Sequence, residues 1–132
     1  HRFGKDTSEY QLLEKFAQEY GRFEARCRCA SASGGILNAF WLHHTDPTDQ
    51  EYTPEGERRE NCGRVLEIDI FETIASEITP ENSYTHFNVH YAKNAHFSPL
   101  LPIDLSRHFH EIAVEWDPDK IVWYVNGEET AR

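Results

Sequence analysis

"RVLEIDIFETIA" (residues 64–75) is the most informative stretch of the sequence. Apolar and acidic residues alternate from 66 to 70, which is the period-2 pattern of a β-strand with one buried face. Strict alternation would then place Phe71 on the acidic face and Glu72 in the core. One extra residue, a β-bulge near Ile70–Phe71, reverses both side chains. The stretch therefore predicts a bulged strand that carries all of its acids on one face.

Three carboxylates, Glu67, Asp69 and Glu72, meet on that predicted face. Adjacent carboxyl groups cannot all ionise cheaply, so one of the three is expected to keep its proton near neutral pH. A protonated acid beside an ionised nucleophile is the pair that retaining glycosidases use, at a carboxyl separation of about 5–5.5 Å. Long glutamate side chains on a curved strand can approach to that distance, with the shorter Asp69 between them. Spacing alone does not say which glutamate takes which role.

Two other interpretations of the acids stay open on residue types alone. Acids on strands are often a solvated face, and clusters of Asp and Glu can bind Ca²⁺. A solvated face would not need the break in alternation, and two glutamates on one strand make a poor cage for a tightly held calcium ion. The acid triplet is therefore a candidate catalytic group, and no metal site is predicted from it.

Strand patterns dominate the rest of the chain. Residues 20–30 alternate between apolar and charged side chains, which predicts a half-buried strand. Residues 36–44 are a short apolar run after two glycines and predict a more buried strand. Residues 83–92 alternate again, and 110–131 indicate a hairpin with a "DPDK" turn, followed by a second turn at "NG" (126–127). Short strands joined by turns and loops predict an all-β sandwich.

The two ends and the middle of the chain are less regular. Residues 8–20 combine helix-forming residues with an alternation broken by one slip, and we expect a strand there because sheet follows. Residues 45–63 lack periodicity and predict a long exposed loop. The chain starts at His1 rather than Met, and its last strand signal stops directly after a turn. Residues 1–132 are therefore expected to form a single domain that is part of a larger one.

Composition argues against several classes of function. The chain has 13 Lys and Arg residues against 23 Asp and Glu, a formal net charge of −10, and no basic stripe, so a nucleic-acid partner is not expected. No apolar run approaches the roughly 20 residues of a membrane span, so no membrane partner is expected either. Three cysteines, Cys27, Cys29 and Cys62, are too few for a disulfide scaffold or a closed zinc site. Cys27 and Cys29 are expected to be small apolar strand residues.

Taken together and in this order, these segments resemble glycoside hydrolase family 16, the retaining endo-glycanases with a concanavalin-like β-jelly roll. "EIDIFE" (67–72) fits that family's E-x-D-x-x-E strand in its bulged form. Further segments resemble the family in "YGRFEAR" (20–26), "AFWL" (39–42), "THFNVHY" (85–91) and "FHEIAVEWDPDKIVWYVNG" (109–127). The resemblance implies an all-β, concanavalin-like jelly-roll sandwich of antiparallel strands from about Tyr20 onward, incomplete at both ends.

The resemblance also implies roles for the acids. Glu67 matches the nucleophile, Glu72 the general acid/base and Asp69 the assisting carboxylate. The implied reaction is hydrolysis of a polysaccharide, such as a β-1,3- or β-1,3-1,4-glucan, by double displacement in a glycoside hydrolase catalytic domain. This chemistry requires no cofactor, although a structural Ca²⁺ elsewhere would not be surprising in a jelly roll. A secreted or extracellular protein is implied, and the oligomeric state is left open.

Residues outside the acid triplet match the sugar cleft of the family. Trp41, in "AFWL", matches an aromatic residue that lines this cleft, and its face suits the apolar C–H face of a pyranose. His90 is similar to the family's histidine after the catalytic strand, and it shares its strand face with two more polar residues. The substrate-binding residues expected on these grounds are Trp41, His86, Asn88 and His90.

Two departures from the family pattern keep other functions open. β-Glucanase members often read W-P-A-F-W where this chain has "ILNAFW" (36–41). They also often place Cys-Gly directly before the nucleophile, whereas "CGRVL" (62–66) leaves three residues between. An endo-hydrolase of marine galactans is therefore one alternative. A non-catalytic, lectin-like carbohydrate-binding domain and an inactive fragment are the others, because fold alone does not decide function.

Overall fold

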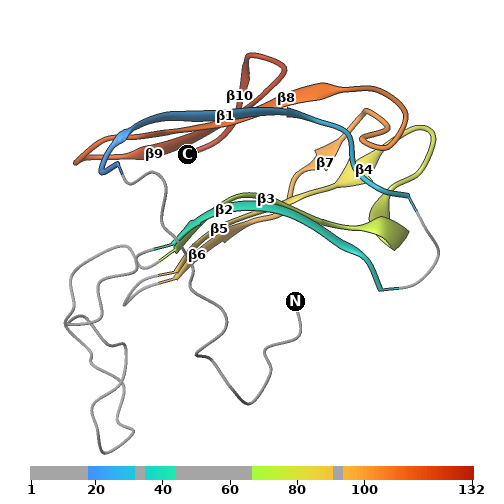
Figure 1. Cartoon of the computed structure of the whole chain (residues 1–132), viewed down its shortest axis with the longest axis horizontal. Coiled ribbons are helices and arrows are strands. Elements are labelled where there is room, and N and C mark those ends of the chain that lie inside the picture. Colours follow the sequence, from blue (N-terminus) through green and yellow to red (C-terminus); the bar gives the residue numbers. More distant parts are fainter. Residues whose placement is uncertain (1–17, 32–34, 44–66, 91–93) are drawn as a thin grey trace, which may run out of the picture.

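The computed structural model describes residues 18–31, 35–43, 67–90 and 94–132. Two main sheets pack face to face, and a small third sheet lies at one end of them (Figure 1). These ranges contain strands and one short 3₁₀ turn but no α-helix. The predicted all-β sandwich is therefore confirmed.

Some predictions concern residues outside these ranges. The strand expected over 8–20 falls almost entirely outside them, as do the loop expected over 45–63 and Cys62. Within the described part of the chain, no helix is long and apolar enough to cross a membrane.

All three sheets are antiparallel. The first main sheet has the order β1-β8-β9-β10, with β1 (Gly21–Cys27), β8 (His110–Trp116), β9 (Ile121–Val125) and β10 (Glu128–Ala131). The second has the order β2-β3-β5-β6, with β2 (Leu37–His43), β3 (Glu67–Ile74), β5 (His86–His90) and β6 (Ala95–Phe97). The small sheet pairs β4 (Ser83–Tyr84) with β7 (Leu100–Leu101), and the 3₁₀ turn η2 (Ala75–Glu77) follows β3.

Strand β1 has the alternation that its sequence predicts. Phe23 packs against the core, whereas Arg22 and Glu24 are exposed. Cys29, just beyond the strand, is buried, and this burial together with Cys27 raises the pKa of its thiol to about 12. Both cysteines are free and act as small apolar residues, as predicted.

The prediction of a more buried strand over 36–44 is wrong. Among the described strands, β2 lies at an edge of the second sheet, and its residues alternate between partial burial and exposure. Phe40 and Leu42 pack against the core, while Trp41 on the opposite face is 50% exposed. A short apolar run does not distinguish a central strand from an edge strand, because both need apolar residues where they face the core.

The predicted β-bulge is present in β3. Asp69 and Phe71 pair with consecutive residues of β2, so Ile70 between them is the additional residue. The ladder to β5 shifts over the same interval, between Asp69 and Glu72. Ile70 and Phe71 are both buried in the core although they are neighbours in the chain. Because two consecutive residues face the core, Glu72 returns to the side of the sheet that carries Asp69.

A buried hydrogen bond ties the bulge to the opposite sheet. Trp123 of β9 is 1% exposed, and its indole Nε1–H donates to the backbone carbonyl of Asp69 at 2.9 Å. The indole also packs on Phe87 of β5 and Phe97 of β6, with ring centroids 5.7 Å apart in each pair. A bulge disturbs the strand ladder locally, and here a side chain from the other sheet donates to a carbonyl within the disturbed interval.

Two turns join β8, β9 and β10, as predicted. In "DPDK" the Asp117 carboxylate accepts backbone N–H bonds from Asp119 and Lys120 at 2.8 and 2.9 Å. At the "NG" turn, Asn126 and Gly127 have φ angles of 52° and 83°. Two consecutive positive φ angles are typical of a type I′ hairpin turn, and Asn followed by Gly suits them best.

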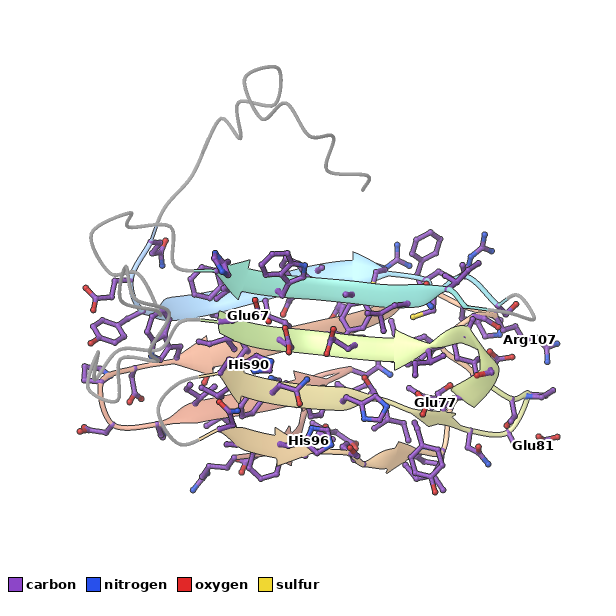
Figure 2. All side chains as sticks on the ribbon, turned by 90° about the horizontal axis from the view of Figure 1, so that it is seen from below. Glu67, Glu77, Glu81, His90, His96 and Arg107 are labelled. Atoms are coloured by element: carbon purple, nitrogen blue, oxygen red, sulfur yellow. The ribbon has the colours of Figure 1, made fainter. Side chains whose placement is uncertain are left out.

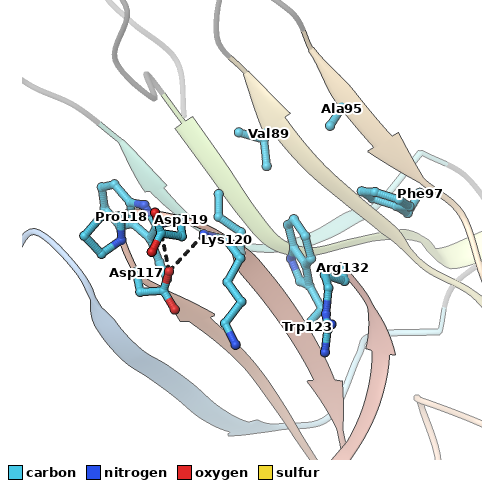
Figure 3. Close-up of a pocket in the computed structure, with 11 residues that line it drawn as sticks. Val89, Ala95, Phe97, Asp117, Pro118, Asp119, Lys120, Trp123 and Arg132 are labelled. Carbon is cyan, nitrogen blue, oxygen red and sulfur yellow. Dashed lines mark hydrogen bonds between the residues drawn. The ribbon is translucent and has the colours of Figure 1, made fainter.

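A pocket of about 390 Å³ opens between the two main sheets at one edge of the sandwich (Figure 3). Val89, Ala95 and Phe97 line it from the second sheet, and Trp123 and the turn at 117–120 line it from the first. Neighbouring residues of a strand point to opposite faces. The pocket therefore lies on the inner face of β5, away from the acids of β3.

Two strands of the structure are missing from the sequence-based prediction. Strands β6 and β7 are three and two residues long, too short for an alternating pattern to emerge. The single strand predicted over 83–92 is divided into β4 and β5 by Thr85. The residues predicted to share one face of this segment do so, because Thr85, Phe87 and Val89 are all buried.

Replacing Trp123 by Phe is expected to destabilise the protein by about 1–3 kcal/mol beyond the cost of the smaller ring, because a buried carbonyl loses its donor. The matched control is Trp116→Phe, since Trp116 is half-buried and its indole makes no hydrogen bond to the described residues. Free energies of unfolding from urea denaturation provide the comparison. Equal losses in the two variants would contradict the role assigned to the Trp123 bond.

Candidate active site

The outer side of the second sheet carries the three carboxylates, and we call it the acidic face. In Figure 1 this sheet arches, and Figure 2 shows its concave side from below. Glu67 of β3, His90 of β5 and His96 of β6 lie across this side of neighbouring strands (Figure 2). The strand order thus brings a row of polar residues from each strand onto one concave surface.

The carboxylates form one contiguous group, with Asp69 in the middle. One oxygen each of Glu67 and Asp69 and one ring nitrogen of His90 all lie within 4.8 Å of one another. On its other side, Asp69 is joined to Glu72 by the side-chain amide of Asn88, which donates to both acids. The Asp69 side chain is 2% exposed, whereas that of Glu67 is 30% exposed. The short acid is therefore buried between two longer acids, which is the placement predicted for it.

Asn88 joins Asp69 to Glu72. Its Nδ2 amide group donates to Asp69 Oδ2 at 2.8 Å and to Glu72 Oε2 at 2.9 Å. Asn88 pairs with Asp69 in the β3–β5 ladder and is buried. Both amide hydrogens are used in these bonds, so Asn88 holds the carboxylates and has no N–H left for a sugar hydroxyl. The substrate contact expected for Asn88 stays a prediction.

His90 lies on the other side of Asp69. Its Nε2 is 3.1 Å from Asp69 Oδ2 and 3.5 Å from Glu67 Oε1, and it pairs with Glu67 in the β3–β5 ladder. A ring N–H at this position is shared between the two acids. The His90 side chain is 45% exposed, so the remaining edge of the ring is open to a ligand.

Glu72 has a shifted proton affinity. Burial raises the pKa of Glu72 above its ordinary value of 4.5, and Asp69 raises it further through its charge and a hydrogen bond. Glu67 adds to this increase, while His90 opposes it. A raised pKa is what a general acid requires, because it must carry a proton when the substrate binds.

Strand β2 adds two rings to the acidic face. Trp41 pairs with Asp69, and His43 pairs with Glu67, across the β2–β3 ladder. The two rings meet edge to face, with centroids 5.5 Å apart. An exposed indole therefore stands beside the carboxylates, where the prediction for Trp41 requires it.

His86 has the right strand and face for the predicted substrate contact, but its ring is engaged elsewhere. Its Nδ1 is 2.8 Å from Ser98 Oγ, and its Nε2 is 2.9 Å from Glu77 Oε2 of η2. His86 pairs with Glu72 in the β3–β5 ladder. Among the described residues its ring nitrogens contact only Ser98 and Glu77, so the structure does not bring His86 into the carboxylate group.

Sequence reasoning missed four polar residues of this region. They are His43, Glu77, His96 and Ser98. His43 follows Trp41 by two residues, so alternation along β2 would have placed it on the same face. His96 and Ser98 have the same spacing, but the three residues of β6 gave no strand signal to which alternation applies.

Glu67, Asp69 and His90 are close enough together to hold a metal ion. Two carboxylates and an imidazole are ligands that a divalent cation accepts. In this structure the same atoms already pair with one another, because His90 Nε2 bonds to Asp69 and lies beside Glu67. We therefore assign no metal to this group, and a structural Ca²⁺ elsewhere stays a prediction.

The fold and the acidic face together match a known family. The family model for glycosyl hydrolases family 16 matches residues 5–132. Because this match covers nearly the whole chain, the protein belongs to glycosyl hydrolase family 16.

Individual members of the family show the same likeness. The chain is 30% identical over 122 residues to the kappa-carrageenase of Pseudoalteromonas carrageenovora, which covers 83% of this chain and 29% of the carrageenase. Among solved structures, it is similar to the laminarinase catalytic domain from Thermotoga maritima, with a TM-score of 0.66, 25% identity and coverage of 88% and 43%. A lichenase derived from a mouse hindgut metagenome gives a TM-score of 0.61 at 27% identity, with coverage of 84% and 44%.

These neighbours confirm the predicted jelly-roll sandwich. The chain spans less than half of the length of each of these relatives.

Replacing Glu72 by Gln is expected to stabilise the protein increasingly as the pH rises from about 4.5 to neutral. Because the pKa of Glu72 is raised on folding, ionisation costs stability above the ordinary pKa, and the cost vanishes below it, where both states are protonated. Glutamine keeps the acceptor for Asn88 without the charge. Urea unfolding at several pH values measures the effect, and Glu81→Gln, at an exposed site, controls for loss of a surface charge. A difference that is independent of pH would contradict the prediction.

Proposed function

We propose that this protein is a retaining endo-β-glycosidase that cleaves a polysaccharide by double displacement. The observation that carries the proposal is the bulge in β3, which puts Glu72 on the face that already holds Glu67 and Asp69. Membership of glycosyl hydrolase family 16 supports the reaction class. The relatives named above, a carrageenase, a laminarinase and a lichenase, support a polysaccharide as the substrate.

In the first step, the ionised carboxylate of Glu67 attacks the anomeric carbon and forms a glycosyl ester. The bond from that carbon to the leaving oxygen breaks, and Glu72 gives its proton to this oxygen. Asn88 already donates to Glu72 Oε2, so the transferable proton is expected on Oε1. The raised pKa of Glu72 supports its assignment as the acid.

In the second step, Glu72 is ionised and removes a proton from water while the water oxygen attacks the anomeric carbon. The ester bond to Glu67 breaks and its carboxylate is restored. Both acids thus return to their starting states, and one water molecule is consumed. Asp69 supports both steps by holding its neighbours apart at a constant spacing, since Asn88 and His90 fix its own carboxylate.

An uncharged β-1,3- or β-1,3-1,4-glucan is the substrate that the acidic face suits best. The four strands of this face contain no Lys or Arg, which are the residues that bind sulfate and phosphate groups. They offer instead the exposed Trp41 ring for the C–H face of a sugar, beside the ring of His43 and on the same face as His90. Because such polymers lie outside cells, we propose a secreted or extracellular protein.

A marine galactan is the second candidate substrate. The observation that favours it is the 30% identity to a kappa-carrageenase. Carrageenans carry sulfate esters, and such a substrate would need basic groups that the described strands of the acidic face lack. The glucan is therefore the first choice.

Release of reducing ends from laminarin, lichenan and kappa-carrageenan tests the proposal. We expect release from the glucans, and a fall in kcat of about 10²–10⁴-fold in Glu72→Ala because the general acid/base is lost. Glu81→Ala, an exposed glutamate outside the site, is the matched control. Binding of these polymers without any release would favour the lectin-like alternative.

Azide rescue separates the roles of the two glutamates on a substrate with an activated leaving group. We expect azide to restore turnover of Glu67→Ala as the inverted glycosyl azide, because azide replaces the missing nucleophile. In Glu72→Ala, azide should instead yield the retained glycosyl azide, because it attacks the ester in place of activated water. If azide fails to rescue Glu67→Ala, Glu67 is not the nucleophile.

A further inference from the structure

A chain of hydrogen bonds leaves the carboxylates and crosses the acidic face to η2. Asn88 Oδ1 contacts His96 Nδ1, and His96 Nε2 is 2.7 Å from Ser98 Oγ. Ser98 Oγ is 2.8 Å from His86 Nδ1, and His86 Nε2 is 2.9 Å from Glu77 Oε2. The rings of His86 and His96 also stack, with centroids 5.7 Å apart and planes at 17°. We call Glu77, His86, Ser98 and His96 the relay; Glu77 and His96 mark two of its positions in Figure 2.

The direction of the first bond follows from the hydrogens of Asn88. Its amide group gives its two hydrogens to Asp69 and Glu72. The Oδ1 atom that faces His96 can therefore only accept. It follows that His96 Nδ1 must carry a hydrogen.

Ser98 decides where the other hydrogens of the relay lie. It has a single hydroxyl hydrogen and two histidine partners, so it can donate to at most one of them. If it donates to His96, then His86 donates to Ser98 through Nδ1. Glu77 as a carboxylate only accepts, so His86 Nε2 also carries a hydrogen and His86 is an imidazolium. If Ser98 donates to His86 instead, His96 carries both ring hydrogens and is the imidazolium.

Both arrangements point an N–H of His96 at Asn88. The ionisable groups that face the relay are Glu77 of η2, beside His86, and the acids Asp69 and Glu72 of β3, beyond Asn88. Acids therefore lie at both ends of the relay, one at its outer end and two at its inner end.

We propose that His96 is a positioning residue for the acid/base Glu72, that it acts through Asn88, and that Ser98 and His86 set its tautomer. With a hydrogen on His96 Nδ1, the amide of Asn88 cannot turn by 180°, because its NH₂ group would then face another N–H and its oxygen would face two acids. Both amide hydrogens stay on the carboxylates, and the proton of Glu72 stays on Oε1. This inference rests on the proposed function of Glu72.

Kinetics of relay variants test the positioning role. His96→Ala is expected to lower kcat by about tenfold or more with little change in KM, because proton transfer suffers while no substrate contact is lost. His96→Gln keeps an amide N–H for Asn88 and is expected to recover most of the loss. Ser98→Ala removes the hydroxyl that sets the tautomer and should lower kcat, whereas Ser98→Thr keeps the hydroxyl and should not. Equal kcat in His96→Ala and His96→Gln would overturn the proposal.

Nitrogen NMR of the histidine rings gives a readout that does not need activity. We expect His96 to carry a hydrogen on Nδ1 in the wild-type protein and in Glu72→Gln, and to lose this preference in Asn88→Ala, where the acceptor is gone. A neutral His96 with its hydrogen only on Nε2 in the wild-type protein would overturn the inference whatever the activity. Full Nδ1–H occupancy in a protein that cleaves no polysaccharide would contradict the proposed function instead, and with it the link from His96 to acid catalysis.

Discussion

The core and the acidic face both follow from one extra residue in β3. In a regular strand, alternation would send Glu72 into the core and Phe71 to the surface. The additional residue Ile70 turns both side chains over, so that two consecutive apolar residues enter the core and the acid leaves it. The Trp123 indole donates to the carbonyl of Asp69 within the same interval. The hydrogen bond from Trp123, on the opposite sheet, thus holds the bulge of β3, the strand that carries the candidate catalytic acids.

Burying an acid among acids is costly unless its oxygens have partners. Asp69 is almost fully buried, and it accepts from Asn88 and from His90. In the described part of the chain, no buried side-chain nitrogen or oxygen lacks a hydrogen-bond partner. These partners are an amide and a histidine rather than Lys or Arg. A fixed positive charge beside Glu72 would lower its pKa, whereas here burial raises it.

Much of this arrangement could be predicted from the sequence, because it depends on local alternation. The break in "EIDIFE" was enough to predict the bulge and the shared face of Glu67 and Glu72, and the "NG" turn was recognisable from its residues alone. The edge position of β2 and the existence of β6 depend on how strands assemble, which a short segment does not encode. His96 was missed for that reason. The hydrogen bonds from Asn88 to Asp69 and Glu72 were missed because pairing register decides which carboxylates an amide can reach.

If Glu67 is the nucleophile and Glu72 the general acid/base, as proposed, the reaction proceeds through a covalent ester and retains the configuration of the anomeric carbon. Proton NMR of the first product released from a β-linked glucan oligosaccharide measures this configuration before mutarotation interconverts the two anomers. We predict that the β-anomer appears first and the α-anomer only later. An α-anomer that appears first would show inversion, in which a water molecule attacks directly. That result would contradict the roles proposed for Glu67 and Glu72.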